Sequence, residues 1–165
     1  MRRTEFTAFY RAAKDPCFRA VCATVADRDE ADDLLAEAFG RAWARWRAVR
    51  SHPAPEAWVV RTALNLHRDR WRRSHAVVRA RPFGALAVVP DDPVVDPAVL
   101  AAVRGLPERQ RDVVVLRVLL DLSVEQTAIE LDIAPGTVTT HLRRALSTLR
   151  ALLVDIGEDE RKCIS

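Results

Sequence analysis

The sequence predicts an all-α protein made of two small helical domains joined by a flexible linker rich in proline and aspartate. Apolar residues recur at helical spacings of three and four on both sides of the middle of the chain. Between them, residues 82–97 contain four prolines, one glycine and three aspartates, a composition typical of a linker. We therefore expect a first domain at 1–80, a linker at 81–97, a second domain at 98–156 and a disordered tail at 157–165.

The composition is that of a soluble globular protein, with 49% hydrophobic and 30% charged residues among 165. No apolar stretch approaches the roughly 20 residues needed to span a bilayer, and the opening MRRTEFTAFY lacks the apolar run of a secretory signal. We therefore expect a cytoplasmic protein with no membrane insertion. Seven arginines but only one aspartate lie at 61–81, and this local excess of positive charge indicates a nucleic-acid contact zone.

The cysteines and histidines predict neither a metal centre nor a catalytic one. Cys17, Cys22 and Cys163 form no CxxC pair and have no histidine nearby, so we expect no zinc site and no disulfide framework, with the first two thiols buried. The four histidines are scattered, and the sequence shows no nucleophile with a base and no Gly-rich phosphate loop. We therefore expect no catalytic residue, no metal and no cofactor, and interpret the chain as not an enzyme.

In the first domain, residues 4–25 predict core helix with a break near Asp15 and Pro16. Residues 28–47 predict the clearest long helix, with acids early and bases late, as the helix dipole favours. From this segment alone, its charged side is expected to be solvated. Its apolar side comprises Ala31, Leu34, Leu35, Ala38, Ala42, Trp46 and Val49.

A third helix is predicted at about 56–73, after a proline-containing loop at 51–58. One of its faces carries three guanidiniums and an amide, which match a track of DNA phosphates. Trp58 at its start could stack on unpaired bases. The alternative is that Trp58 and Trp71 belong to the core and that the arginines only confer solubility. The polar face comprises Arg61, Asn65, Arg68 and Arg72.

The second domain begins with a helix after Pro107 that is apolar nearly all round from Val113 to Leu120, so we expect it to be buried. Next, Ser123 and Gln126 form a capping box that starts a short helix. That helix ends at 132–134.

A further helix begins at Pro135, whose fixed φ and missing donor suit a first helical position. One side of it predicts a buried stripe, and the other carries small, hydroxylic and cationic groups with no carboxylate from Thr137 to Leu153. An amphipathic surface helix with a solvated basic face would show the same pattern, but the capped helix before it and the Ala-Pro-Gly corner favour a DNA-reading helix-turn-helix. The stripe comprises Val138, Leu142, Ala145, Leu149 and Leu152, and the opposite face Gly136, Thr140, Arg143, Arg144 and Ser147.

Three segments together resemble bacterial RNA polymerase sigma factors of the extracytoplasmic-function (ECF) group. DEADDLLAEAFGRAWARW is similar to the group's helix that docks on the polymerase clamp, and AWVVRTALNLHRDRWRR to its promoter-melting and minus-ten segment. LPERQRDVVVLRVLLDLSVEQTAIELDIAPGTVTTHLRRALSTLR resembles its minus-thirty-five domain. The resemblance therefore implies a sigma region two at 1–80 and a sigma region four at 98–156, in an alternative sigma factor that directs core RNA polymerase to specific promoters.

The resemblance also implies partners and roles for individual residues. The partners are the clamp helices of core RNA polymerase and promoter DNA, both duplex and single-stranded; an anti-sigma factor is left open. Polymerase contacts fall on Asp32, Asp33, Glu37 and Arg41. Minus-ten recognition and melting fall on the loop 47–57 and on Trp58, Arg61, Asn65, Arg68 and Arg72. Minus-thirty-five recognition falls on Gly136, Thr137, Thr139, Thr140, Arg143 and Arg144.

The chain departs from the group's pattern at three positions: Ala36 stands where the group commonly has Gln, and Thr139 and His141 replace residues that are usually basic. The alternative function is a helix-turn-helix regulator of the response-regulator type that acts without binding core polymerase. Such a protein needs a receiver domain, which the helical arginine-rich first half does not resemble. A regulatory protein that occupies polymerase without reading DNA is a further alternative, and it would not depend on Arg143 and Arg144.

Overall fold

The computed structural model describes residues 1–77 and 96–162, with side chains at 1–74 and 96–154. Within these ranges the secondary structure is helical and contains no strand, which confirms the predicted all-α class. The chain divides into two compact units, Met1–Val89 and Pro90–Ser165. Most of the predicted linker lies outside the described residues, so the bounds expected for it stay a prediction.

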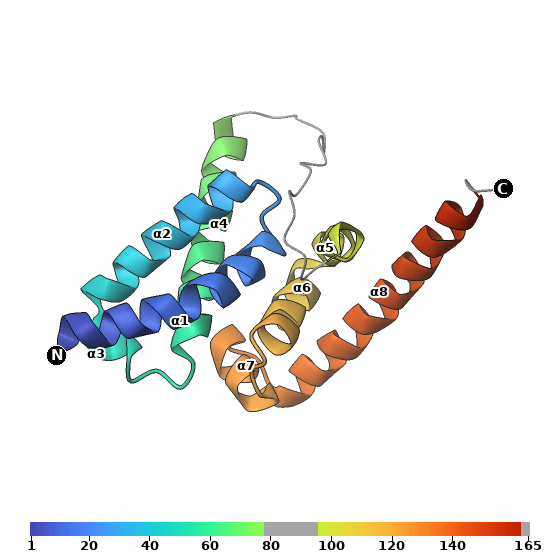
Figure 1. Cartoon of the computed structure of the whole chain (residues 1–165). Coiled ribbons are helices and arrows are strands. Elements are labelled where there is room, and N and C mark those ends of the chain that lie inside the picture. Colours follow the sequence, from blue (N-terminus) through green and yellow to red (C-terminus); the bar gives the residue numbers. More distant parts are fainter. Residues whose placement is uncertain (78–95, 163–165) are drawn as a thin grey trace. The chain divides into compact units, whose positions relative to one another are not determined.

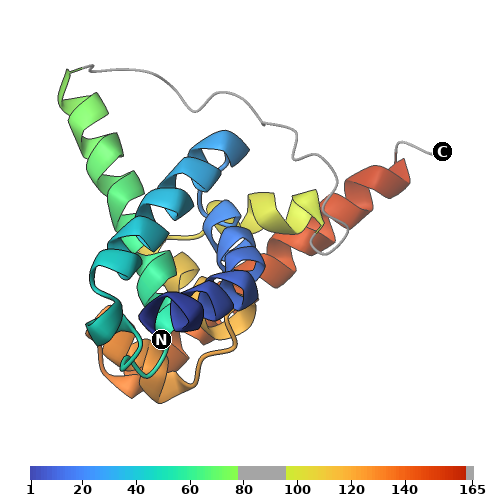
Figure 2. The same cartoon turned by 60° about the vertical axis from the view of Figure 1, so that its left-hand side comes forward.

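The first unit contains three long helices that pack against one another. They are α1 (Arg2–Cys22), α2 (Arg28–Ala44) and α4 (Pro55–Val77), with the four-residue α3 (Trp46–Val49) between the last two. In Figures 1 and 2, α1 and α2 lie side by side, and α4 contacts both. The surfaces of α2 and α4 that face away from this packing carry the residues predicted to bind partners.

Helix α2 has the predicted core side and a well-defined start. One carboxylate oxygen of Asp27, Oδ1, accepts hydrogen bonds from the backbone N–H groups of Asp29 at 2.9 Å and Glu30 at 3.1 Å. The predicted helix at 28–47 is interrupted at Arg45, where φ is −107° and ψ is 21°. All seven residues of the predicted apolar side are buried: Ala31, Leu34, Leu35, Ala38, Ala42, Trp46 and Val49.

The predicted break in α1 near Asp15 and Pro16 is wrong, because α1 continues through Pro16 to Cys22. Pro16 has no N–H to donate to the carbonyl of Ala12 one turn earlier, which ordinarily disfavours a helix interior. The residues on either side nevertheless share one buried face, so burial of apolar surface outweighs the lost hydrogen bond. That face comprises Ala13, Cys17, Ala20 and Val21.

An aromatic cluster joins α1 to the end of α2 and to α3. The ring centroid of Trp46 lies 5.1 Å from that of Phe6 and 5.1 Å from that of Phe9. The ring of Trp43 lies 5.1 Å from Phe6 and is 39% exposed. The cluster therefore fixes the start of α1 over the junction between α2 and α3.

The second unit packs four short helical segments with one long helix. The segments α5 (Pro97–Arg104), α6 (Glu108–Val114) and α7 (Val124–Leu131) all contact the long helix α8 (Pro135–Lys162), and the π-helix η1 (Val115–Leu119) follows α6 directly. Figure 1 shows α7 at the beginning of α8. The core of this unit includes Leu100, Val103, Leu106, Val113, Val138 and Ala145.

The predicted burial from Val113 to Leu120 holds only for the first half of that stretch. Val113 and Leu116 are buried, but Val118 is 56% exposed. The reason is the π-helix, in which the N–H of Leu120 bonds to the carbonyl of Val115, five residues earlier, at 3.2 Å. The wider turn rotates the following side chains away from the direction that α-helical periodicity predicts.

Helix α8 is longer than expected and less covered toward its end. It continues to Lys162, past position 157, where a disordered tail was expected to begin. After Pro135 its sequence contains no proline, and Glu158, Glu160 and Arg161 are good helix formers. In the predicted stripe, Leu142 is half-buried and Leu152 is 38% exposed, because periodicity does not reveal where the covering elements stop. The buried members are Val138, Ala145 and Leu149.

Candidate nucleic-acid interface

The corner between α7 and α8 has the geometry that the sequence predicted. Ser123 Oγ accepts from the N–H of Gln126 at 3.0 Å, and Gln126 Oε1 accepts from the N–H of Ser123 at 2.8 Å, which confirms the capping box. Helix α7 ends at Asp132, which is left-handed with φ of 52°. Because α8 starts at Pro135, the two helices are joined by a very short turn. This is a helix-turn-helix.

The first turns of α8 present most of the predicted DNA-reading residues to solvent. Thr140 is half-buried, whereas Val138 between the reading residues is fully buried and anchors the helix. A Cβ built on Gly136 would meet no heavy atom within 4 Å, so packing inside the chain does not require glycine there. The exposed reading residues are Gly136, Thr137, Thr139, Arg143 and Arg144.

The threonine hydroxyls already donate hydrogen bonds within the helix. Thr139 Oγ1 donates to the carbonyl of Pro135 at 3.3 Å, and Thr140 Oγ1 donates to the carbonyl of Gly136 at 2.9 Å. A hydroxyl oxygen keeps two lone pairs when its proton is used. In this rotamer both threonines can therefore accept a hydrogen bond from a base amino group.

The predicted polar face of α4 is also at the surface. Arg61, Asn65 and Arg72 are exposed, and Arg68 is half-buried. Arg68 Nη1 donates to Asn65 Oδ1 at 3.1 Å, and Arg72 is paired with the carboxylate of Asp69. The four residues therefore lie on one accessible, mainly positively charged face of α4, in which Arg68 and Asn65 are hydrogen-bonded to each other.

The two tryptophans of α4 differ in environment. Trp71 is 56% exposed, so of the two alternatives for this residue the structure does not support the core role. Trp58 is half-buried at the first turn, and its backbone carbonyl accepts from Thr62 Oγ1 at 2.8 Å. A half-buried ring at this position is compatible with both packing against the core and stacking on a base.

The residues predicted to bind polymerase lie on α2. Asp32, Asp33 and Arg41 are exposed, and Glu37 is half-buried. Glu37 accepts from Arg41 at 2.8 Å on its own helix and from Arg70 of α4 at 3.0 Å. Desolvation opposes ionisation of Glu37, but hydrogen bonds and charge from these two arginines outweigh it and lower its pKa.

Two side chains of α4 that no motif predicted connect it to α2. Arg70 bridges to Glu37, and His67 Nδ1 lies 2.9 Å from Glu30 Oε1. Sequence analysis missed both pairs because each joins residues more than thirty positions apart. The helix proposed to dock on polymerase and the helix proposed to bind the single strand are therefore connected by two polar bridges.

The two cysteines among the described residues, Cys17 and Cys22, both lie in α1. Cys17 is fully buried as predicted, its Sγ donates to the carbonyl of Glu56 at 3.7 Å, and burial together with the charge of Glu56 raises its pKa to about 12. Cys22 is half-buried, not buried as expected. Among the described residues, no group of histidine, cysteine and acidic side chains is placed to hold a metal ion. None of the described helices is long and apolar enough to cross a membrane.

An all-helical chain with an exposed helix-turn-helix in one unit and an arginine-lined helix in the other belongs to the class of helical DNA-binding proteins. Residues 9–77 match the family model for sigma-70 region 2, and residues 97–149 match the model for sigma-70 region 4. The RNA polymerase sigma-E factor of Streptomyces coelicolor is 33% identical over 162 residues, which are 95% of this chain and 90% of that protein. The chain therefore belongs to the sigma-70 family, in its ECF group.

Further relatives agree with this assignment. The ECF RNA polymerase sigma factor SigW of Bacillus subtilis is 27% identical over 87% of this chain and 86% of its own length. Among solved structures, the sigma factor RpoE from Bartonella quintana, crystallised with the anti-sigma factor NepR, matches with a TM-score of 0.73 at 18% identity. That match covers 90% of this chain and 96% of the other, and at this identity it supports the fold.

Proposed function

We propose that this chain is an alternative sigma factor that binds core RNA polymerase, directs it to specific promoters and helps to melt the minus-ten region. The observation that carries the proposal is the order of the two sigma-70 matches along one chain, region 2 at 9–77 followed by region 4 at 97–149. A response-regulator type of regulator is not favoured, because the residues that would have to form its receiver domain match region 2.

Each function is assigned to one unit of the chain. The first unit binds core polymerase through Asp32, Asp33, Glu37 and Arg41 of α2, and the single strand through Trp58 and the polar face of α4. The second unit binds the minus-thirty-five duplex through six residues of α8: Gly136, Thr137, Thr139, Thr140, Arg143 and Arg144. Eleven of these fifteen residues are exposed and the other four are half-buried, which supports the assignment because contact with a partner requires accessible surface.

The chain acts as a specificity subunit without a catalytic centre of its own, in the cytoplasm where core polymerase works. Polymerase supplies the chemistry, and the chain supplies contacts to DNA. An anti-sigma factor is a further candidate partner, and it would compete with core polymerase for this chain.

The test is promoter-dependent transcription with core RNA polymerase from the same organism. The chain and core together, but neither alone, should melt and transcribe a subset of genomic promoter fragments. Permanganate reactivity of thymines in the minus-ten region reports melting, and run-off transcripts report initiation. Tight binding of duplex DNA by the chain alone, with no effect of core, would refute the proposal.

Two variants separate the proposed contacts. Arg143→Ala should weaken promoter binding by the holoenzyme, and Arg150→Ala is its matched control because Arg150 is exposed on the same helix beyond the reading residues. Loss of one guanine contact costs about 1–3 kcal/mol, or roughly 5–150-fold in affinity. Asp33→Ala should weaken binding to core, whereas Asp15→Ala on exposed α1 should not.

A further inference from the structure

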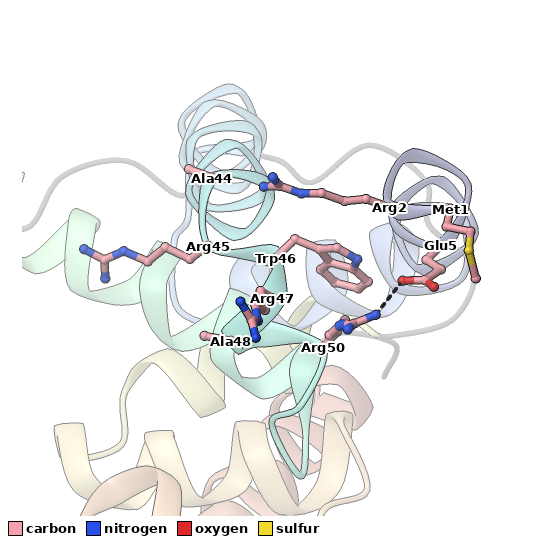
Figure 3. Close-up of a pocket in the computed structure, with 9 residues that line it drawn as sticks. All are labelled: Met1, Arg2, Glu5, Ala44, Arg45, Trp46, Arg47, Ala48 and Arg50. Atoms are coloured by element: carbon pink, nitrogen blue, oxygen red, sulfur yellow. Dashed lines mark hydrogen bonds and ion pairs between the residues drawn. The ribbon is translucent and has the colours of Figure 1, made fainter.

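A pocket of about 620 Å³ lies in the first unit between the start of α1 and residues 44–50, and two of its residues, Arg47 and Arg50, belong to the loop 47–57 that the resemblance assigns to minus-ten recognition. Figure 3 shows its lining side chains. Four arginines contribute to it, against one carboxylate, that of Glu5. The excess of positive charge at a concave surface attracts anions. The arginines are Arg2, Arg45, Arg47 and Arg50.

One of these arginines, Arg2, is held in place by the protein, and a second, Arg50, has one exposed partner. The guanidinium of Arg2 lies over the ring of Trp43, 4.7 Å from its centroid, and donates to the carbonyl of Trp43 at 2.6 Å. Arg50 Nη1 donates to Glu5 Oε2 at 3.0 Å. Figure 3 shows Arg45 pointing away from Trp46, whereas Arg2 and Arg50 lie on either side of its ring. Fixed guanidiniums lose little freedom when they bind a ligand.

The decisive feature is the indole of Trp46. Trp46 is only 5% exposed, and its Nε1 is buried with no hydrogen-bond acceptor among the described residues. Buried tryptophan N–H groups usually have a partner. Figure 3 shows this nitrogen on the side of the ring that faces α1, between Arg2 and Glu5, at the pocket. The indole N–H needs an acceptor, and the neighbouring guanidiniums favour an acceptor with negative charge. An anion would satisfy both.

We infer that this pocket is a phosphate-binding subsite in which the Trp46 indole N–H and the guanidiniums of Arg2, Arg47 and Arg50 are the donors. A phosphate group offers several acceptor oxygens and can satisfy a guanidinium and an indole at once. The phosphate belongs either to the backbone of single-stranded promoter DNA or to a small phosphate compound. Only the first source rests on the proposed function.

Glu5 lines the same pocket and would compete with the phosphate for Arg50. Its carboxylate is paired with Arg50 in an exposed ion pair, with 40% of the Glu5 side chain and 51% of the Arg50 side chain accessible. Exposed pairs of this kind are weak and are readily exchanged. A phosphate that binds Arg50 would displace Glu5 from this ion pair and could then accept a hydrogen bond from the Trp46 indole N–H. Removal of the Glu5 charge should therefore strengthen binding.

The test follows the indole N–H resonance of Trp46 in the ¹⁵N-labelled full chain by NMR. The resonance is identified by elimination, because the other three indoles are removed one at a time. Inorganic phosphate is titrated against chloride at constant ionic strength, and a short thymidine oligonucleotide is titrated in parallel. We expect a saturable shift of the Trp46 signal. The eliminating variants are Trp43→Phe, Trp58→Phe and Trp71→Phe.

Three charge variants test whether the shift of the Trp46 signal is caused by phosphate bound in the pocket. Arg47→Gln should weaken binding about tenfold, as loss of a charged hydrogen bond does, and Glu5→Gln should strengthen it. Arg3→Gln is the control, because Arg3 is exposed on α1 and does not line the pocket. A shift with the oligonucleotide alone identifies a strand phosphate, whereas a shift with both probes shows that a free phosphate group suffices.

The inference is overturned if neither probe moves the Trp46 signal, or if Arg3→Gln and Arg47→Gln weaken binding equally. These outcomes are independent of the transcription test. Phosphate binding without promoter-dependent transcription would refute the proposed function alone, and transcription without a Trp46 response would refute the subsite alone.

Discussion

Replacing Ser123 by alanine should destabilise the second unit while leaving the first unit unchanged. Ser123 Oγ accepts the N–H of Gln126 at 3.0 Å, and this half-buried donor has no helical partner in the first turn of α7. Loss of an N-cap side chain costs about 1 kcal/mol, within a range of roughly 0.5–2. In a domain of this size, about 1 kcal/mol lowers the melting temperature by roughly 4–8 °C.

The distribution of tryptophan allows the two units to be followed separately. All four tryptophans lie in the first unit, so their fluorescence reports the unfolding of that unit alone, whereas far-UV circular dichroism reports helices of both. Thermal unfolding of Ser123→Ala should shift only the transition seen by circular dichroism. Ser123→Asp should retain the cap. Ser147→Ala, on the exposed side of α8, should have an effect within about 0.5 kcal/mol.

The reasoning would be refuted in either of two ways. An unchanged circular dichroism transition in Ser123→Ala would mean that the cap contributes nothing to stability. Equal shifts in both signals would mean that the effect is not confined to the second unit.

Three further outcomes are expected. Cys17 should resist alkylation in the folded chain, because its pKa of about 12 leaves little thiolate, and should react after unfolding; peptide mass spectrometry measures both. Glu37→Gln should lower the free energy of unfolding at neutral pH by no more than about 1 kcal/mol, because the ion pairs of Glu37 with Arg41 and Arg70 are exposed. In urea unfolding, this difference should disappear as the pH falls below 4.5 and through the lowered pKa of Glu37. The sign follows because a lowered pKa in the folded state stabilises the protein only while the carboxylate is ionised. If Arg144 contacts a phosphate, Arg144→Ala should reduce the slope of log affinity against log salt concentration by about 0.9. If the variant keeps the slope of the parent protein but binds its specific promoter more weakly, Arg144 contacts a base instead.

Local features of the fold could be predicted from the sequence because their causes are local. The Ser123 capping box depends on two residues three positions apart, and it is present as expected. The buried side of α2 follows from apolar spacing, because a helix fixes which side chains share a face. Family resemblance added the order of the two sigma regions.

Features that depend on tertiary contact could not be predicted. Nothing in the local pattern around Arg70 or Glu37 indicates that they meet across two helices. The continuous path of α1 through Pro16 depends on burial, which can outweigh a lost backbone hydrogen bond. The unpaired nitrogen of Trp46 has no sequence signal at all, because the spacing that correctly places the residue in the core says nothing about its hydrogen bonding.

The π-helix at Val115–Leu119 makes the second unit sensitive to chain length in a way that side-chain substitution would not reveal. A π turn accommodates one residue more than an α turn, so deletion of a single residue here would allow a regular α-helix to form. Every later residue would then be rotated by about 100° about the helix axis. Leu122, which is buried, would leave the core, and the start of α7 would change direction. At this position, insertions and deletions are therefore the mutations expected to change the orientation of the DNA-reading helix α8.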